Sequence, residues 1–271
     1  MLSKAGSFRF HIESYVCDFT GKATLPVMSS FILDAASIHA QQRGFGYEHI
    51  SKDNVAWVLS RLSVEITEYP GYDEDLTVET WVENVSRYFT QRCFRFINQD
   101  DRVIGYARSI WAAIDRKTRR PVDIPAWRPD LAAYIDEEKE CPIEKMAKIP
   151  SVDDVEATMG YSVRYSDIDI NRHMNSVKYI EHALNVFDLS MFGEKYIYKF
   201  EIIYLAEGIF GDKLKLYRKD ISENEQIIDA KKGEESVCRI RIIWKPCHCG
   251  LDPQSLAQSI CHCGLDPQSP D

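Results

Sequence analysis

The sequence lacks the long hydrophobic runs that mark membrane and secreted proteins. No apolar stretch approaches the roughly 18 to 20 residues of a membrane-spanning helix, and the opening MLSKAGSFR has no apolar segment of a secretory signal. Stable membrane insertion is therefore not expected, and a cytoplasmic location is predicted. The composition, 45% hydrophobic and 28% charged over 271 residues, is that of a soluble globular protein and excludes disorder, collagen and coiled coil.

Basic residues and paired cysteines are also scarce. The 33 Lys and Arg are outnumbered by 42 Asp and Glu, and the net charge of -9 argues against nucleic-acid binding. No GxGxxG, P-loop, HExxH or GxSxG motif is present, so nucleotide-binding, zincin and serine-hydrolase functions have no support. No cofactor and no metal are predicted. Four cysteines without CxxC spacing are interpreted as reduced thiols: Cys17, Cys93, Cys141 and Cys238.

The last 25 residues differ in kind from the rest. The nonapeptide CHCGLDPQS occupies 247–255 and recurs unchanged at 261–269. Identical copies without a periodic apolar face are typical of translation through a DNA repeat, so 247–271 is predicted to be an adventitious, disordered tail. The alternative is a zinc site made of the Cys-His-Cys pairs, although these lack the usual CxxC spacing. Deleting the tail should change activity little, whereas a protein that binds metal through it would lose its function.

The remaining chain contains one pattern twice. In the first half an alternating stretch at 8–19 precedes a helix expected from Leu25 to Arg43, with Thr24 as its cap and Gly44 after it. Period-two alternation then predicts strands around 62–66, 76–80, 94–96 and 103–114.

The second half repeats this order. A strand expected at 159–170 leads to a helix from Ser176 to Ser190, and 200–217 overlays 62–79 without a gap. A last strand is expected at 237–245. This pattern predicts an α+β protein of two modules, 1–128 and 156–246, joined by a charged linker at 129–155. The two sheets can join at their edges and leave an apolar crevice between sheet and helices.

Polar side chains gather in the loop before the second helix. Asp169, Asn171 and His173 alternate with other residues, so in an extended segment all three project to one side. There a carboxylate, an amide and an imidazole would meet the helix N-terminus, whose N–H groups can stabilise an oxyanion. The alternative is that Asp169 or Asn175 merely caps the helix and His173 lies on the surface. The first half has FTGKATL at the corresponding place, without these three polar side chains. This difference between the halves favours one active and one supporting module.

The stretch DIDINRHMNSVKYIEHAL, at 167–184, resembles the signature of the fatty acyl-acyl carrier protein thioesterases, a family with plant chloroplast and bacterial members. The similarity covers about residues 7–245 and includes LPVMSSFILDAASIHA, WVLSRLSVEI and SIWAAIDRKTRRPVDIP. It implies a double (tandem) hot-dog fold, in which one shared antiparallel sheet wraps two long helices. Because no transit-peptide-like extension precedes Phe8, a bacterial cytoplasmic member is expected.

By this resemblance Asp169, Asn171 and His173 are catalytic, and YLAEG at 204–208 places Glu207 at the family's catalytic glutamate. Plant members follow that glutamate with a cysteine once proposed as the nucleophile; here the residue is Gly208, and activated water is the remaining mechanism. Glu207, buried in the crevice and helped by Asp169, is expected to deprotonate the water, which Asn171 and His173 orient. Backbone amides at the start of the helix would receive the negative charge. Without the resemblance, the preferred interpretation of Glu207 is an exposed carboxylate at a strand end, because nothing local distinguishes it from Glu201 or Glu194.

The resemblance also implies an acyl chain as substrate and acidic acyl carrier protein as partner. Candidate walls of the acyl pocket lie in the first module, although apolar residues at such spacing are more often plain core: Met28, Phe31, Ile32, Leu62, Val64 and Trp111. An acidic chain needs a local basic patch to bind an acidic partner. The densest basic cluster, which is equally well interpreted as a solvated turn, is Arg116, Lys117, Arg119 and Arg120, with Arg87, Arg92 and Arg128 nearby in sequence.

Two other functions remain open. A coenzyme A thioesterase of the same fold would differ in the carrier of the acyl group. A non-catalytic acyl-binding protein of that fold would not need the four candidate catalytic residues together. The sequence also leaves open the preferred acyl-chain length and the oligomeric state, a homodimer included.

Overall fold

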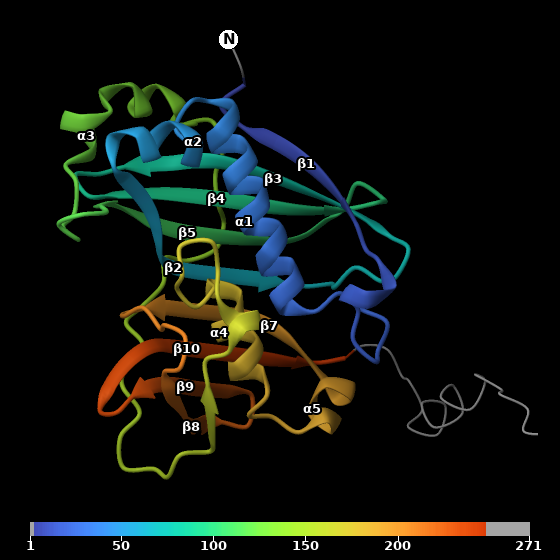
Figure 1. Ribbon diagram of the computed structural model, residues 1–271. Coiled ribbons are helices and arrows are strands. Elements are labelled where there is room, and N and C mark those ends of the chain that lie inside the picture. The colour runs from blue at the N-terminus through green and yellow to red at the C-terminus, as the bar shows by residue number, and fades with distance from the viewer. Residues whose placement is uncertain (1–2, 248–271) are drawn as a thin grey trace, which may run out of the picture.

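Ten antiparallel strands form one continuous sheet, with the two principal helices on the same face of it (Figure 1). The computed structural model describes residues 3–247. The strand order is β1-β3-β4-β5-β2-β7-β10-β9-β8-β6, so the second half of the chain mirrors the first half strand by strand. This arrangement confirms the predicted α+β double hot-dog architecture.

The elements of the first half are β1 (Gly6–His11), α1 (Leu25–Gln42), α2 (Tyr47–Ile50), β2 (Val55–Ile66), β3 (Asp75–Val85), β4 (Phe89–Asn98), β5 (Val103–Asp115) and α3 (Ile124–Trp127). Those of the second half are β6 (Met159–Ser162), α4 (Ser176–Leu184), α5 (Leu189–Glu194), β7 (Lys195–Tyr204), β8 (Lys213–Ser222), β9 (Glu225–Lys232) and β10 (Glu235–Pro246). Short 3-10 turns are η1 (Ser14–Val16), η2 (Ser51–Asp53), η3 (Pro129–Tyr134) and η4 (Tyr165–Asp167).

Both principal helices begin where the sequence predicts. Thr24 Oγ1 accepts the N–H of Val27 at 3.4 Å, and Asn175 Oδ1 accepts the N–H of Val177 at 2.9 Å. These bonds satisfy N–H groups that have no partner inside a helix. Gly44 follows α1 with a φ of +76°, a conformation that favours glycine and ends the helix.

Helix α4 is shorter than predicted. It ends at Leu184 instead of Ser190, because the chain turns at Asn185 and starts the separate helix α5 four residues later. The turn lets the Phe187 ring pack edge-on against Trp244, with 5.2 Å between the ring centroids. Tertiary packing of an aromatic ring therefore overrides the helical spacing of the sequence.

The strands before the two helices are also shorter than predicted. The stretch 8–19 is extended only as far as His11, and 159–170 only as far as Ser162. In both halves a 3-10 turn and a tight loop follow before the helix begins. Apolar and polar residues continue to alternate beyond His11 and Ser162, but there they belong to loops and not to strands.

The two modules join through strands β2 and β7. Leu62 pairs with Ile202, Val64 pairs with Phe200, and between them Ser63 faces Glu201. In the gap-free overlay of 62–79 on 200–217, Ser63 and Glu201 are counterparts, so an approximate two-fold axis passes between them. The same axis relates every strand of one module to its counterpart in the other.

The linker after η3 crosses the outer face of the second module. Ile149 and Val152 pack against Ile227 of β9, whose neighbour Ile228 points the opposite way into the central core. Successive side chains of a strand alternate between the two faces of a sheet. The linker therefore covers the face that α4 leaves open.

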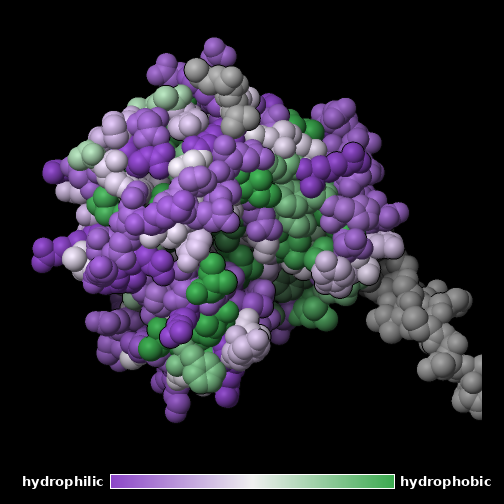
Figure 2. All heavy atoms as spheres, turned by 45° about the horizontal axis from the view of Figure 1, so that its top comes forward, coloured by the Kyte–Doolittle hydropathy of each residue, from purple (hydrophilic) through white to green (hydrophobic). Residues whose placement is uncertain are grey.

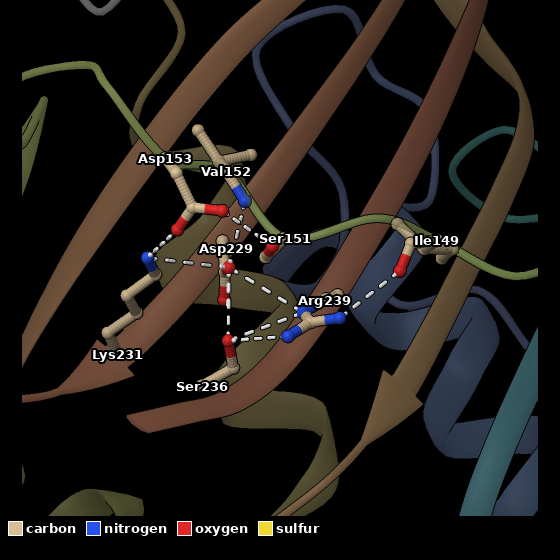
Figure 3. Close-up of polar contacts among 8 residues, drawn as sticks. All are labelled: Ile149, Ser151, Val152, Asp153, Asp229, Lys231, Ser236 and Arg239. Atoms are coloured by element: carbon tan, nitrogen blue, oxygen red, sulfur yellow. Dashed lines mark hydrogen bonds and ion pairs between the residues drawn. The ribbon is translucent and has the colours of Figure 1, made fainter. Parts of the chain in front are cut away.

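A buried carboxylate fastens the linker to this face (Figure 3). Asp229, 0% exposed, accepts the N–H of Val152 at 3.0 Å and the hydroxyl of Ser236 at 3.0 Å, while Arg239 lies 3.6 Å away. Burial raises the pKa of Asp229, although the Val152 N–H, the Ser236 hydroxyl and the neighbouring cations act in the opposite direction. Lys231 bridges the cluster to Asp153 of the linker at 2.9 Å.

We expect Asp229→Ala to lower the free energy of unfolding by about 2–3 kcal/mol, because it leaves a buried N–H and a buried cation without their partner. Asp153→Ala is the matched control. Its carboxylate is 62% exposed, and removing it should leave the unfolding free energy nearly unchanged. Urea unfolding curves measure both variants, and equal effects would contradict the assignment of Asp229 as the anchor.

Candidate active site

The loop from Ile168 to Met174 is a tight hairpin and not the extended segment expected from the sequence. Ile168 bridges Met174, and the Asp169 N–H donates to the His173 carbonyl at 2.8 Å. Arg172 at the tip has a φ of +65°. Asp169, Asn171 and His173 are therefore brought together by a turn.

The Asp169 carboxylate holds this hairpin in shape. Its Oδ1 accepts the backbone N–H of Asn171 at 2.8 Å and that of His173 at 3.2 Å, and its Oδ2 lies 3.4 Å from the Asn171 side-chain amide. Both oxygens of Asp169 are thus used inside the loop. This carboxylate positions the other two side chains.

Glu207 follows β7 and meets the hairpin from the neighbouring strand. The Met174 N–H donates to the Gly208 carbonyl at 2.8 Å, and the Gly208 N–H donates to the Tyr179 hydroxyl oxygen at 2.7 Å. These bonds tie the segment after β7 to both the hairpin and α4. The Glu207 Oε2 consequently lies 3.4 Å from Nε2 of His173.

A residue of the first module completes this group. Arg119, on the turn after β5, donates a short hydrogen bond to the Glu207 carboxylate, and this bond raises the pKa of Arg119. The Glu207 side chain is 34% exposed, so it is not enclosed in an apolar crevice as expected. Sequence reasoning placed Arg119 only in the basic cluster, since nothing in its local sequence indicates a contact with the other module.

Most backbone amides at the start of α4 already have partners. The N–H of Met174 bonds to Gly208, that of Asn175 bonds to the Asp167 carbonyl, and that of Val177 bonds to the Asn175 side chain. The expected oxyanion site at the helix end is therefore largely occupied. Asn171 lines a nearby cavity, and a side-chain amide is a hydrogen-bond donor of the kind that can stabilise an oxyanion.

This cavity has a volume of about 310 Å³ and runs from Asn171 into the first module. Its walls are residues of α1, α2 and strands β2 to β5, among them Leu33, Ala36, Trp57 and Trp111. The volume falls at the lower end of the range for sites that bind small organic ligands. The first module therefore supplies an apolar pocket that ends at the polar group of the second module.

Only Trp111 of the six predicted pocket walls lines this cavity. Phe31 stacks on Phe10, with 4.5 Å between the ring centroids. The other four are at most 1% exposed and belong to the central core: Met28, Ile32, Leu62 and Val64. The cavity follows the second half of α1, and the predicted residues lie nearer its beginning or deeper in the sheet.

The predicted basic cluster divides into two groups. Arg116, Lys117 and Arg120 are exposed and form no ion pair with another described residue, whereas Arg119 binds Glu207. Of the residues nearby in sequence, Arg87 pairs with Asp123 and Arg128 pairs with Asp130. Arg92 is buried and donates to the ring of His39 at 3.0 Å; burial lowers its pKa to about 9.

Within residues 3–247 no cluster of His, Cys, Asp and Glu is arranged to hold a metal, and no helix is long and apolar enough to cross a bilayer. Cys17, Cys93, Cys141 and Cys238 form no disulfide, as predicted. The structure of the tail cannot be compared with its prediction, because residues 248–271 lie outside the described part of the chain.

Gly208 is closely packed against the side chains of Tyr179 and Met174. A Cβ atom here would lie 2.9 Å from the Tyr179 hydroxyl oxygen and 3.4 Å from the Met174 Cβ. We expect Gly208→Cys to lower the free energy of unfolding by about 1–3 kcal/mol through overpacking, without raising turnover. Gly160→Ala is the control, because its Cβ would meet Leu214 at an ordinary 3.7 Å. Thermal unfolding and a turnover assay measure both; a gain of activity in Gly208→Cys would contradict this account.

Comparison with known proteins identifies the family. Residues 6–131 match the family model for the acyl-ACP thioesterase N-terminal domain, and residues 151–246 match that for the C-terminal domain. The crystal structure of an acyl-ACP thioesterase from Bacteroides thetaiotaomicron has a TM-score of 0.83 and 41% sequence identity, covering 89% of this chain and 98% of that chain. The 12:0-ACP thioesterase from Umbellularia californica, at 21% identity, shares the fold with a TM-score of 0.81 over 91% of this chain and 99% of its own.

A curated relative is oleoyl-acyl carrier protein thioesterase 2, chloroplastic, of Arabidopsis thaliana, 28% identical over 203 residues that make up 65% of this chain and 52% of the relative. The chain spans about half the length of the curated relatives it matches. Two hot-dog modules in one chain, with a carboxylate and an imidazole on and beside a hairpin that reaches an apolar cavity through Asn171, define a tandem hot-dog protein of the thioesterase type. The chain belongs to the acyl-ACP thioesterase family, which confirms the resemblance seen in the sequence.

Proposed function

We propose that this chain hydrolyses fatty acyl-[acyl carrier protein] thioesters to a free fatty acid and the carrier thiol, in the cytoplasm of a bacterium. One observation carries the proposal: the Glu207 carboxylate lies 3.4 Å from the His173 ring, and the hairpin that holds His173 reaches the cavity of the first module through Asn171. The similarity to the Bacteroides thetaiotaomicron acyl-ACP thioesterase supports the substrate class and the bacterial origin. Every group named in this site comes from this chain.

Activated water fits the residues that are present. Glu207 removes a proton from a water molecule, His173 orients that water, and the oxygen attacks the thioester carbonyl carbon. The Asn171 amide donates a hydrogen bond to the oxyanion. When the intermediate collapses, the C–S bond breaks and the thiolate takes the proton back from Glu207. A thiol pKa of about 8.5 makes the thiolate a good leaving group without a strong general acid.

Asp169 and Arg119 act through their neighbours in this proposal. Asp169 keeps the hairpin closed, so that Asn171 and His173 face the reacting carbonyl. Arg119 holds the Glu207 side chain beside His173 from the other module. Both are positioning residues, and Glu207 is the proton acceptor.

The exposed basic group Arg116, Lys117 and Arg120 is the proposed contact for the acidic carrier protein. Their reversal to Glu is expected to raise KM for an acyl-carrier thioester by about 10-fold at low salt, because opposite charges steer association. The kcat should change little, since Arg119 is left in place. An uncharged acyl-pantetheine ester serves as the control substrate. An equal rise in KM for that ester would show that these residues do not bind the carrier.

The function is tested by a hydrolysis assay with a panel of acyl carrier protein thioesters and the matching coenzyme A esters, run beside His173→Ala. We expect turnover of the carrier thioesters and a large loss in the variant. Preference for the coenzyme A esters would identify the alternative thioesterase. Binding without turnover would identify a non-catalytic acyl-binding protein.

A further inference from the structure

The loop before α1 is a structural copy of the hairpin before α4. The Asp18 N–H donates to the Lys22 carbonyl at 2.9 Å, and the Asp18 carboxylate accepts the Thr20 N–H at 2.8 Å, which repeats the two bonds of the hairpin. Gly21 takes the positive φ at the tip. The matched residues are Asp18 and Asp169, Thr20 and Asn171, Lys22 and His173, and Tyr69 and Glu207.

A second cavity, of about 990 Å³, opens beside this loop. The loop itself, the first turns of α1, the C-terminal end of α4 and α5 line it. The face of the molecule drawn in Figure 2 is largely hydrophilic, with hydrophobic residues gathered in its hollows. Several lining positions correspond by the two-fold axis to those of the first cavity: Leu184 to Leu33, Asn185 to Asp34, Phe187 to Ala36 and Thr20 to Asn171.

The chemistry of this second site differs from that of the first. Tyr69 stands in place of Glu207, and its hydroxyl donates to the Ile197 carbonyl at 2.9 Å, so the position that corresponds to Glu207 holds no carboxylate. Lys22 stands in place of His173. It is half-buried and forms no ion pair with another described residue.

The acids near this ammonium group have other partners. Asp18 accepts from Thr20, Glu74 accepts the N–H of Gly71 at 2.8 Å, Glu68 pairs with Arg102 at 3.4 Å, and Glu181 pairs with Lys178 at 2.7 Å. Lys195, the other cation of the lining, pairs with Glu223 at 3.1 Å. The site therefore combines an apolar wall with Lys22, a cation that forms no ion pair with a described residue. An amphiphile with one negative charge matches both features, whereas a neutral thioester would not use the cation.

We propose that the second cavity binds a free long-chain fatty acid, with its carboxylate at Lys22 and its alkyl chain against Leu184 and Phe187. The site is a binding site and not a second catalytic centre. Its occupation is measured directly as binding, so the result does not depend on whether Glu207 catalyses hydrolysis.

The test is equilibrium dialysis of the full chain with dodecanoate, which gives the number of bound molecules and their affinities. Lys22→Met keeps the length of the side chain and removes the charge, and Leu184→Trp fills the cavity. Ala36→Phe obstructs the first cavity and separates the two sites. Dodecanol, which has the same chain without the carboxylate, is the control ligand.

We expect a dodecanoate site that survives Ala36→Phe, disappears in Leu184→Trp and weakens about 10-fold or more in Lys22→Met, as for the loss of a charge-assisted hydrogen bond. Lys22→Arg should restore it, and Lys22→Met should leave dodecanol binding and thioester turnover unchanged. Dodecanoate binding that Lys22→Met does not weaken would overturn the proposal. So would the loss of all binding in Ala36→Phe alone.

Discussion

Glu207→Gln is expected to lower kcat for a fatty acyl-carrier thioester by about 10²–10⁴-fold, the range that a positioned general base contributes. The glutamine keeps the size of the side chain and can still accept a hydrogen bond from Arg119, but it cannot take a proton from water. KM should change little, because Glu207 belongs neither to the proposed acyl cavity nor to the proposed carrier contact. Steady-state kinetics of the purified variant measures both constants.

The control for this variant is Glu223→Gln, which removes a carboxylate that is 85% exposed on the same module. Its kinetics should match those of the unmodified chain. The thermal unfolding of Glu207→Gln should also be close to that of the unmodified chain, since Glu207 is one-third exposed. A Glu207→Gln variant that keeps most of its turnover would exclude Glu207 as the base, and direct attack by another group would have to be considered.

Local signals in the sequence are sufficient for the frame of this fold. Thr24 and Asn175 cap the two helices as predicted, because a cap depends on a few adjacent residues. The gap-free overlay identifies 62–79 and 200–217 as counterparts, and the structure pairs the counterparts Ser63 and Glu201 at the centre of the sheet. The polar loop and Glu207 also lie together, as the family resemblance implied.

Features that depend on distant contacts could not be predicted. Arg119 reaches Glu207 across the junction of the modules, and no local pattern encodes that approach. Phe187 leaves the helical spacing to pack on Trp244, which lies more than fifty residues later in the chain. Periodicity alone cannot separate a cavity wall from the core. Leu62, a predicted wall of the acyl pocket, belongs to the core, whereas Ala36, which was not among the predicted walls, lines the cavity.

Ala36→Phe is expected to abolish most turnover of palmitoyl thioesters, with a loss of about 100-fold or more, and to spare octanoyl thioesters within about 10-fold. Ala36 lines the acyl cavity on α1, and its counterpart in the second module is Phe187. There the larger ring packs on Trp244, the counterpart of Trp111, and lines the second cavity. Each methylene that a pocket cannot accommodate reduces catalytic efficiency by about 10–200-fold, so long chains should suffer most.

Ile38→Phe is the matched control, since Ile38 lies on the same helix with 40% of its surface exposed and does not line the cavity. That variant should hydrolyse both thioesters at the original rates. The Ala36→Phe variant should also lose about 1–3 kcal/mol of unfolding free energy if the new ring strains its surroundings. Thermal unfolding measures this loss and so separates it from the change in the preferred acyl-chain length. An equal loss for palmitoyl and octanoyl thioesters would mean that the acyl chain does not enter this cavity, and the wide cavity beside Lys22 would then be the remaining place for it.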